Sequence, residues 1–180
     1  MSVIQSTPPR RRHRLAALGA ALALAAVPAV AGTSAEAASC AVTWGSLAKT
    51  SAPLVTGRVA AVRAGHHPCY DRLVLDMTGR APGYDVRYVR TVYTEGGGFP
   101  VPLAGGARLA VVVRKGATRI PTMPSVAGYP TFRQVRWAGS FEGYTTIGLG
   151  VRARLPFRVF TLVDSVHGTS RLVVDVAHHW

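Results

Sequence analysis

Residues 65–79 of the sequence, GHHPCYDRLVLDMTG, bring together side chains that could bind a metal ion or transfer protons. The segment holds two histidines, a cysteine, a tyrosine and two aspartates. Histidine, cysteine and carboxylate groups are the usual ligands of zinc, and histidine and carboxylate groups serve in general acid–base catalysis. The first question is whether the surrounding chain can aim these groups at one point.

A β-strand predicted for the second half of this segment argues against such a cluster. Side chains alternate between the faces of a strand, so Asp71 and Asp76 point to opposite sides and cannot form an acid and base pair. The adjacent residues His66 and His67 also point apart, which rarely lets both bind one metal ion, and the doublet at 178–179 repeats the problem. We therefore expect structural or solvated histidines, no metal site, no cofactor and no catalytic residues.

The first 32 residues are expected to be a signal peptide rather than part of the fold. A cluster of four arginines precedes an apolar run over 15–32 that is short and alanine-rich for a membrane span. Small residues at the right spacing place the cleavage near residue 32 or as late as residue 39. General secretion and twin-arginine export both stay open. The sequence thus predicts a secreted or cell-wall-associated protein with no stable membrane span after cleavage.

Export also determines the expected state of the two cysteines. Because the exported compartment is oxidising, Cys40 and Cys69 are expected to form a disulfide. Closing that loop of roughly thirty residues constrains the unfolded chain by about 3–4 kcal/mol. The bond would tie a lead-in segment over 33–56 to a β domain over 57–180, and it removes Cys69 as a nucleophile or ligand.

The chain is strongly basic, with 21 lysines and arginines against 8 acidic residues. Four of these arginines lie in the predicted leader, which leaves a formal charge of about +9 on the remainder. In the cytoplasm such a charge would suggest nucleic acid as the partner. Export instead favours a cell-wall polymer or an envelope protein and no nucleic acid, although arginine-rich composition alone could also produce the surplus.

From residue 57 onward, short runs of β-branched and aromatic residues alternate with glycine, proline and polar turns. This pattern predicts an all-β fold, a single β-sandwich or barrel-like domain of about eight strands. The proline-rich segment 116–130 is expected to be one long loop. The expected strands cover 57–63, 70–77, 84–93, 107–114, 131–137, 144–152, 156–163 and 169–176.

Two of these strands repeat one pattern, DRLVLDM at 71–77 and SRLVVDV at 170–176. Strand alternation predicts that their leucines point into the core and that their arginines and aspartates point outward. Antiparallel pairing in register would join Arg72 to Asp175, Val74 to Val173, and Asp76 to Arg171. The two strands could instead occupy equivalent places in different sheets, and a chance likeness is a third possibility.

The stretch 137–160 contains a predicted tight turn at Glu142, followed by Tyr144 and a glycine-rich strand. Gly148 and Gly150 lack side chains on one face, which would permit close approach of a ligand or of backbone, or simply a bend in the sheet.

With these segments, the chain resembles the AMIN-like domain proteins of actinobacteria, a mostly uncharacterised group of exported proteins. The resemblance rests on VRAGHHPCYDRLVLDMTG (62–79), PGYDVRYV (82–89), SFEGYTTIGLGV (140–151), and PFRVF with SRLVVDVAH (156–160 and 170–178). It is looser for the AMIN domain of cell-wall amidases and secretins, a non-catalytic β-sandwich. The resemblance implies envelope binding, and it places Arg72, Asp76, Arg171 and Asp175 on AMIN-type strands. No amidase or secretin domain follows in the sequence, so any activity is expected to come from a partner.

The leading hypothesis is a secreted, non-catalytic module that binds peptidoglycan, another anionic wall polymer or a wall-associated protein. Strand arginines would contact the ligand, with Tyr88 and Trp137 available for stacking on sugar or peptide. The candidate binding residues are Arg72, Asp76, Arg87, Arg133, Arg136, Glu142, Tyr144, Arg158, Arg171 and Asp175.

Two alternatives belong to other classes of function. A small secreted hydrolase could use Glu142 or Asp76 as its base, and a secreted protease inhibitor could present the loop 116–130. An enzyme should show converging titratable groups in a cleft, an inhibitor a protruding loop, and a binding module a face of arginine and aromatic groups.

Overall fold

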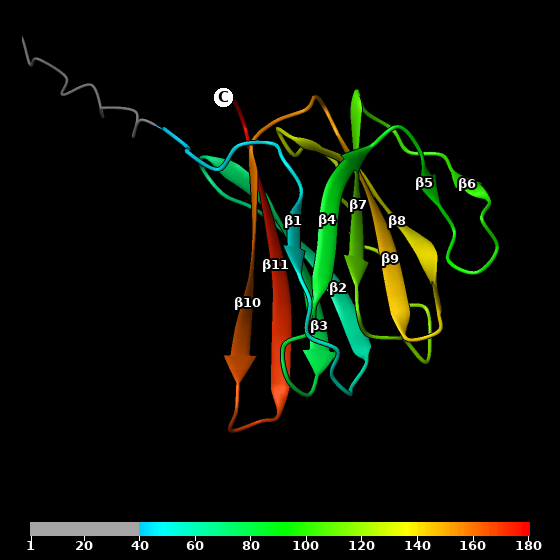
Figure 1. The fold of residues 1–180 in the computed structure, drawn as a ribbon. Helices are drawn as coiled ribbons and strands as arrows, with labels where there is room; N and C mark the ends of the chain where they lie inside the picture. The colour runs from blue at the N-terminus through cyan, green and yellow to red at the C-terminus, as the bar shows by residue number, and fades with distance from the viewer. Residues whose placement is uncertain (1–39) are drawn as a thin grey trace, which may run out of the picture. The chain divides into compact units, whose positions relative to one another are not determined.

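β-strands make up much of residues 40–180, the part of the chain that the computed structural model describes (Figure 1). The predicted signal peptide over 1–32 and the later cleavage position near 39 lie outside the described residues. Within those residues there is no helix long and apolar enough to cross a membrane. The strands are β1 (Lys49–Ser51), β2 (Val59–His66), β3 (Tyr70–Thr78), β4 (Tyr84–Val89), β5 (Val92–Tyr93), β6 (Pro100–Val101), β7 (Ala107–Val113), β8 (Phe132–Phe141), β9 (Tyr144–Val151), β10 (Phe157–Asp164) and β11 (Thr169–Ala177).

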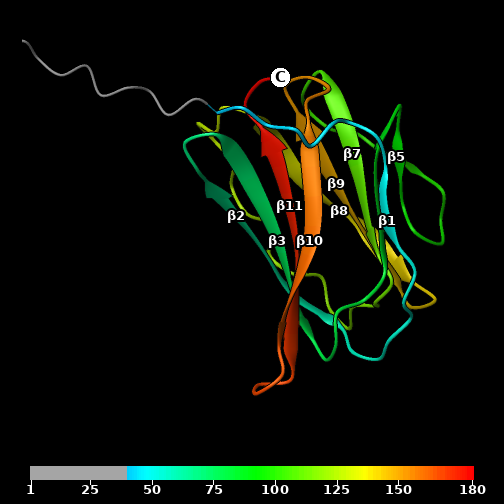
Figure 2. The same ribbon diagram turned by 60° about the vertical axis from the view of Figure 1, so that its left-hand side comes forward.

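Two antiparallel sheets form the layers of a β-sandwich, which Figure 2 shows from a second side. One sheet has the strand order β1-β4-β7-β9-β8, and the other has the order β10-β11-β3-β2. Each sheet keeps two edge strands, so the fold is all-β without a closed barrel. The short strands β5 and β6 pair separately as a two-stranded ribbon.

The hydrophobic core lies between the two sheets, where strand alternation turns every second side chain inward. Full burial of each aliphatic side chain stabilises the fold by about 1.5–3 kcal/mol. The fully buried residues include Leu73, Leu75, Leu172 and Val174 from the four-stranded sheet and Leu109, Val111, Ile147 and Leu149 from the five-stranded sheet.

All eight expected strands are present, and the loop over 116–130 contains no named strand. The strand expected over 84–93 is wrong in its extent, because β4 ends at Val89 and β5 begins at Val92. Val89 pairs with Arg108, which is only the second residue of the partner strand β7. Beyond this point β4 has no partner strand with which to form further hydrogen bonds. The chain leaves the sheet there and forms the β5–β6 ribbon, and one further strand, β1, lies in the lead-in.

The two repeated strands, β3 and β11, pair antiparallel in the predicted register. Arg72 pairs with Asp175, Val74 with Val173, and Asp76 with Arg171. The inward leucines of both repeats are fully buried. The two strands therefore lie side by side at the centre of the four-stranded sheet, and the alternative with separate sheets is wrong.

The predicted disulfide joins Cys40 to Cys69, with their Cα atoms 5.2 Å apart. It fixes the start of the described chain beside the beginning of β3. Close to this bond, Trp44 packs edge-on against Tyr70, with ring centres 5.7 Å apart. The first described residues of the lead-in are thus held on the four-stranded sheet by a covalent bond and by an aromatic contact, whereas β1 pairs with β4 in the other sheet.

Asp71, at the start of β3, ties the two sheets together at one end of the sandwich. Its fully buried Oδ2 accepts hydrogen bonds from the backbone N–H groups of Thr131 (2.7 Å) and Phe132 (2.8 Å), where β8 begins. Burial raises the pKa of Asp71, but hydrogen bonds from Phe132, His66, Thr131 and His178 outweigh this effect and hold the pKa below its usual value. The carboxylate is therefore charged at neutral pH.

Lys115 makes the corresponding tie at the other end. Its side chain follows β7 and is 1% exposed. The Nζ donates to the carbonyl oxygens of Thr78 and Arg80, the latter at 2.6 Å, where β3 ends. Burial lowers the pKa of this amine.

Lys115→Met is expected to lower the free energy of unfolding by about 1–3 kcal/mol near neutral pH, because two buried carbonyl oxygens lose their donor. The pKa of Lys115 lies below 10.5 in the folded protein. At pH values just below 10.5, the Lys115 amine is therefore protonated more often in the unfolded chain than in the folded protein. The stability of the wild type relative to the variant should therefore rise with pH in this window. Urea unfolding of both proteins from neutral pH to about pH 10 measures this difference. Equal stability at every pH would contradict it.

Candidate functional site

The outer surface of the four-stranded sheet carries two groups of ion pairs. Because the leucines of β3 and β11 point inward, the side chains between them point outward. We refer to six of these outward residues as the arginine face: Arg63 of β2, Arg72 and Asp76 of β3, Arg158 of β10, and Arg171 and Asp175 of β11.

Asp175 holds two of the arginines at one end of the arginine face. Its carboxylate accepts from Arg72 Nε at 2.6 Å and Nη2 at 2.9 Å, and from Arg158 Nε at 2.8 Å. The Asp175 side chain is fully buried, whereas Arg72 and Arg158 keep 25% and 41% exposure. The hydrogen bond to Asp175 raises the pKa of Arg72, against the opposing effect of burial. This carboxylate therefore fixes the orientation of both guanidinium groups.

Asp76 holds the other two arginines in a more open arrangement. It accepts from Arg63 Nε at 2.5 Å and Nη2 at 2.8 Å, and Arg171 Nε lies 3.8 Å away. Arg63 and Arg171 are 57% and 48% exposed. These two arginines have the most exposed side chains of the four on this face.

Aromatic rings surround the Asp175 end of the arginine face. The guanidinium of Arg158 lies 4.4 Å from the ring centre of Trp44 and 5.3 Å from that of Phe160. The guanidinium of Arg72 lies 5.2 Å from the ring centre of Tyr70. Cation–π contacts of this kind add about 0.5–1 kcal/mol each at exposed sites, so the rings help to keep the guanidinium planes in place.

An apolar row separates the two ion clusters. Phe160 of β10 pairs with Val173 of β11, which pairs with Val74 of β3. The same row continues to Arg63 of β2, which pairs with Val74, and Val74 and Val173 are 8% and 2% exposed. The arginine face therefore presents two groups of arginines around a largely buried apolar centre. Such a surface suits a ligand that carries several anionic groups.

Four arginines share two aspartates on this face, which leaves a formal surplus of two positive charges. Guanidinium groups bind carboxylate and phosphate through paired hydrogen bonds and do not release protons. Both aspartates are already paired with arginines. The chemistry that this arrangement favours is the binding and orientation of anions.

Arg133 and Arg136, two further candidates, lie on β8 in the other sheet. The guanidinium of Arg133 donates to the carbonyl oxygens of Tyr129, Pro130 and Phe132, so it stays against its own backbone. Arg136 donates to Pro102 O at 3.4 Å. The structure does not bring these two residues to the arginine face.

Glu142 and Tyr144 form part of the tight turn between β8 and β9, as expected. Glu142 has φ of 47° and Gly143 has φ of 82°, the positive values that a two-residue type I′ hairpin requires. Both candidate side chains are exposed and stand apart from the arginine face. The geometry explains Glu142 as a turn residue.

The glycines of β9 permit close approach by the protein's own chain. A Cβ atom at Gly148 would meet the Leu103 side chain at 2.8 Å, and one at Gly150 would meet Ala104 O. A small apolar cluster packs here against the outside of the five-stranded sheet; its members are Val92, Val101, Leu103, Ala110 and Ala138. The segment that carries β5 and β6 thus covers part of this sheet. Leu103 and Ala104 fill the space above the two glycines, so that space is not open to a ligand.

Tyr88 and Trp137, which were expected to be available for stacking on a ligand, are partly buried and pack against the core. The Tyr88 hydroxyl also donates to Leu155 O at 2.8 Å. Arg87, a neighbour of Tyr88, is exposed and pairs with Asp85 at 2.6 Å on the five-stranded sheet.

Three residues in or beside the arginine face were not identified from the sequence: Arg63, Tyr70 and Phe160. A usable signal existed for two of them, since Arg63 and Phe160 occupy outward positions by simple strand alternation. Trp44 was expected to pack on the sheet, but its contact with Arg158 joins segments 114 residues apart and has no local signature.

The residues named for the alternative functions find little support in this geometry. Glu142 and Asp76 lie on different sheets, so they do not converge. A groove beside the β10–β11 turn has Arg80 and Asp164 as its only ionisable lining residues, which gives no pair of carboxylates. The loop over 116–130 packs against the core through Val126, and only part of it is exposed.

Comparison with known families matches residues 57–178 to the AMIN-like domain. The match covers well over half of the chain, and the protein belongs to the AMIN-like domain family. Such domains are typically cell-wall binding modules rather than catalysts, and AMIN domains occur in periplasmic or secreted envelope proteins. No curated protein matches the sequence.

Proposed function

We propose that this protein is a secreted, non-catalytic module that binds an anionic polymer of the cell envelope, with peptidoglycan as the first candidate. The binding surface is the arginine face. The observation that carries the proposal is the presence of four arginines and two aspartates on one outer sheet surface, beside aromatic and apolar groups. Family membership supports the same class of function.

Preorganisation is the physical argument for this face. A ligand that binds flexible arginines must first order their side chains, at a cost of about 0.5–1.5 kcal/mol each. Asp175 and the rings of Trp44 and Phe160 already hold Arg158 in the folded protein. Most of the free energy needed to order this side chain is therefore spent during folding and not during ligand binding. Arg63 and Arg171 then supply exposed guanidinium surface for the anionic groups.

The other candidate residues fit less well. Arg133 donates its hydrogen bonds to three carbonyl oxygens of its own chain, and the outer surface near Arg136 is partly covered by residues 102–104. Glu142 adds negative charge at an exposed turn, next to Tyr144. The proposal therefore rests on the arginine face and leaves these four residues outside the binding surface.

Sedimentation of the purified protein with purified peptidoglycan tests the proposal. We expect binding at low salt that weakens roughly tenfold as salt is raised, because exposed contacts of about 0.2–1 kcal/mol each are screened over about 8–10 Å at physiological ionic strength. A neutral polysaccharide serves as the control and should not retain the protein. Failure to bind any wall fraction at low salt, or retention indifferent to salt, would contradict the proposal. Release of new soluble fragments would instead indicate a hydrolase.

A further inference from the structure

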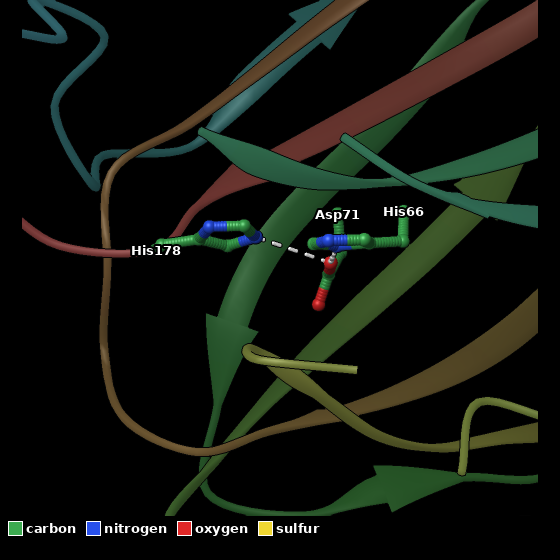
Figure 3. A group of neighbouring side chains, drawn as sticks. All are labelled: His66, Asp71 and His178. Carbon is green, nitrogen blue, oxygen red and sulfur yellow. Dashed lines mark hydrogen bonds and ion pairs between the residues drawn. The ribbon is translucent and has the colours of Figure 1, made fainter. Parts of the chain in front are cut away.

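Two histidines, one from the adjacent pair 66–67 and one from the adjacent pair 178–179, contact Asp71 at one end of the sandwich. His66 closes β2, Asp71 lies near the start of β3, and His178 follows β11, so three strands place the side chains together (Figure 3). His66 Nδ1 and His178 Nε2 each lie 3.1 Å from Asp71 Oδ1. The sequence predicted structural or solvated histidines and no metal site, whereas the fold brings one histidine of each adjacent pair to the same aspartate.

The spacing of these three atoms suits a metal ion. In a tetrahedral site with metal–ligand distances of about 2.0–2.2 Å, neighbouring ligand atoms lie about 3.3–3.6 Å apart. Both nitrogen–oxygen distances are close to this value, and all three atoms lie within 4.8 Å of one another. The two imidazole rings lie nearly parallel, with centroids 5.4 Å apart, and they must turn toward a common point to bind one ion.

The ligand atoms are also held by their surroundings. Asp71 Oδ2 accepts the Thr131 and Phe132 N–H groups, which leaves Oδ1 directed at the two imidazoles. His178 is fixed through its backbone N–H, which donates to Cys69 O at 3.0 Å. Such outer contacts orient metal ligands and are a usual part of metal sites.

We propose that His66 Nδ1, Asp71 Oδ1 and His178 Nε2 form a binding site for a divalent transition-metal ion. Two imidazoles and one carboxylate favour Zn²⁺ among the common ions, and they exclude the all-oxygen coordination that Mg²⁺ and Ca²⁺ prefer. His66 is 51% exposed and His178 is 13% exposed, so the ion can enter from the His66 side. The remaining coordination positions face solvent there and can take water or an anionic ligand. This site is independent of the proposed wall binding.

Calorimetric titration of the purified, untagged protein with ZnCl₂ tests the site. We expect one Zn²⁺ per chain, and a loss of affinity of at least about 100-fold in both His66→Ala and His178→Ala, since each removes a direct ligand. The matched control is His167→Ala, because His167 also pairs with an aspartate, Asp164, at 2.8 Å, but without a second histidine. Its affinity should equal that of the wild type. Visible absorption of Co²⁺ bound to the wild type reports the same ligands spectroscopically.

Two outcomes would overturn the proposal. One is no Zn²⁺ binding by the wild type at micromolar concentrations, and the other is equal affinity of His66→Ala and His167→Ala. His66 is exposed, so its replacement should leave the fold intact, which circular dichroism of each variant checks.

Discussion

Asp175→Ala is expected to lower the free energy of unfolding by about 3 kcal/mol, near the lower end of the range for breaking a buried ion pair. The carboxylate is fully buried and accepts three hydrogen bonds from Arg72 and Arg158. Its removal leaves two guanidinium groups close together without a counter-charge. The loss stays near the lower end because both arginines are partly exposed and can turn toward water. Chemical denaturation of variant and wild type measures it.

Asp76→Ala provides the matched control for this prediction. Asp76 occupies the equivalent place in the repeated strand pattern and also pairs with two arginines. Its side chain is 27% exposed, and its partners are about half exposed. Exposed pairs contribute only about 0–1 kcal/mol, so this variant should lose at most that amount. Equal losses in the two variants would show that burial of Asp175 does not have the energetic role assigned to it.

Loss of the Cys40–Cys69 disulfide is the second large effect, and it should lower the free energy of unfolding by about 3–4 kcal/mol. The bond closes a loop between cysteines 29 residues apart, so reduction allows the unfolded chain many more conformations. The double variant Cys40→Ser, Cys69→Ser and the reduced wild type should unfold at the same, lower denaturant concentration.

This second prediction has an internal check. Trp44 packs on Tyr70 and Arg158 only a few residues after Cys40, so opening the disulfide should also loosen the lead-in and expose this ring. A red shift of tryptophan fluorescence in the native, reduced protein would report that change. An unchanged unfolding midpoint after complete reduction would contradict the prediction.

Much of the fold was predictable because its signals are local. Strand alternation depends on neighbouring residues, and it placed the inward leucines of β3 and β11 correctly. The register of these strands was one of the alternatives that the repeated pattern left open, and in-register antiparallel pairing does place Arg72 opposite Asp175 and Asp76 opposite Arg171. The disulfide followed from having two cysteines after the leader.

The parts that could not be predicted depend on contacts between distant segments. The cover over Gly148 and Gly150 comes from residues 103–104, in the segment between β6 and β7. His66 and His178 meet only once β2, β3 and β11 are adjacent in one sheet. The sequence alone also could not assign Arg133 and Arg158 to different sheets, since both lie in ordinary strand patterns.

A comparison of two double variants tests the central claim most directly, that wall binding occurs on the arginine face. Arg63→Gln with Arg171→Gln removes two charges from this face, and Arg133→Gln with Arg136→Gln removes the same charge from β8. All four side chains are exposed, so both proteins should fold.

The affinity of each double variant for purified peptidoglycan is the quantity to measure, at one low salt concentration. We expect the Arg63 and Arg171 variant to bind roughly tenfold more weakly than the wild type, since about 1.4 kcal/mol corresponds to a factor of ten. The Arg133 and Arg136 variant should change by less than about twofold, which corresponds to about 0.4 kcal/mol. The opposite order, with binding lost from the β8 variant and kept in the other, would contradict the assignment of the binding surface.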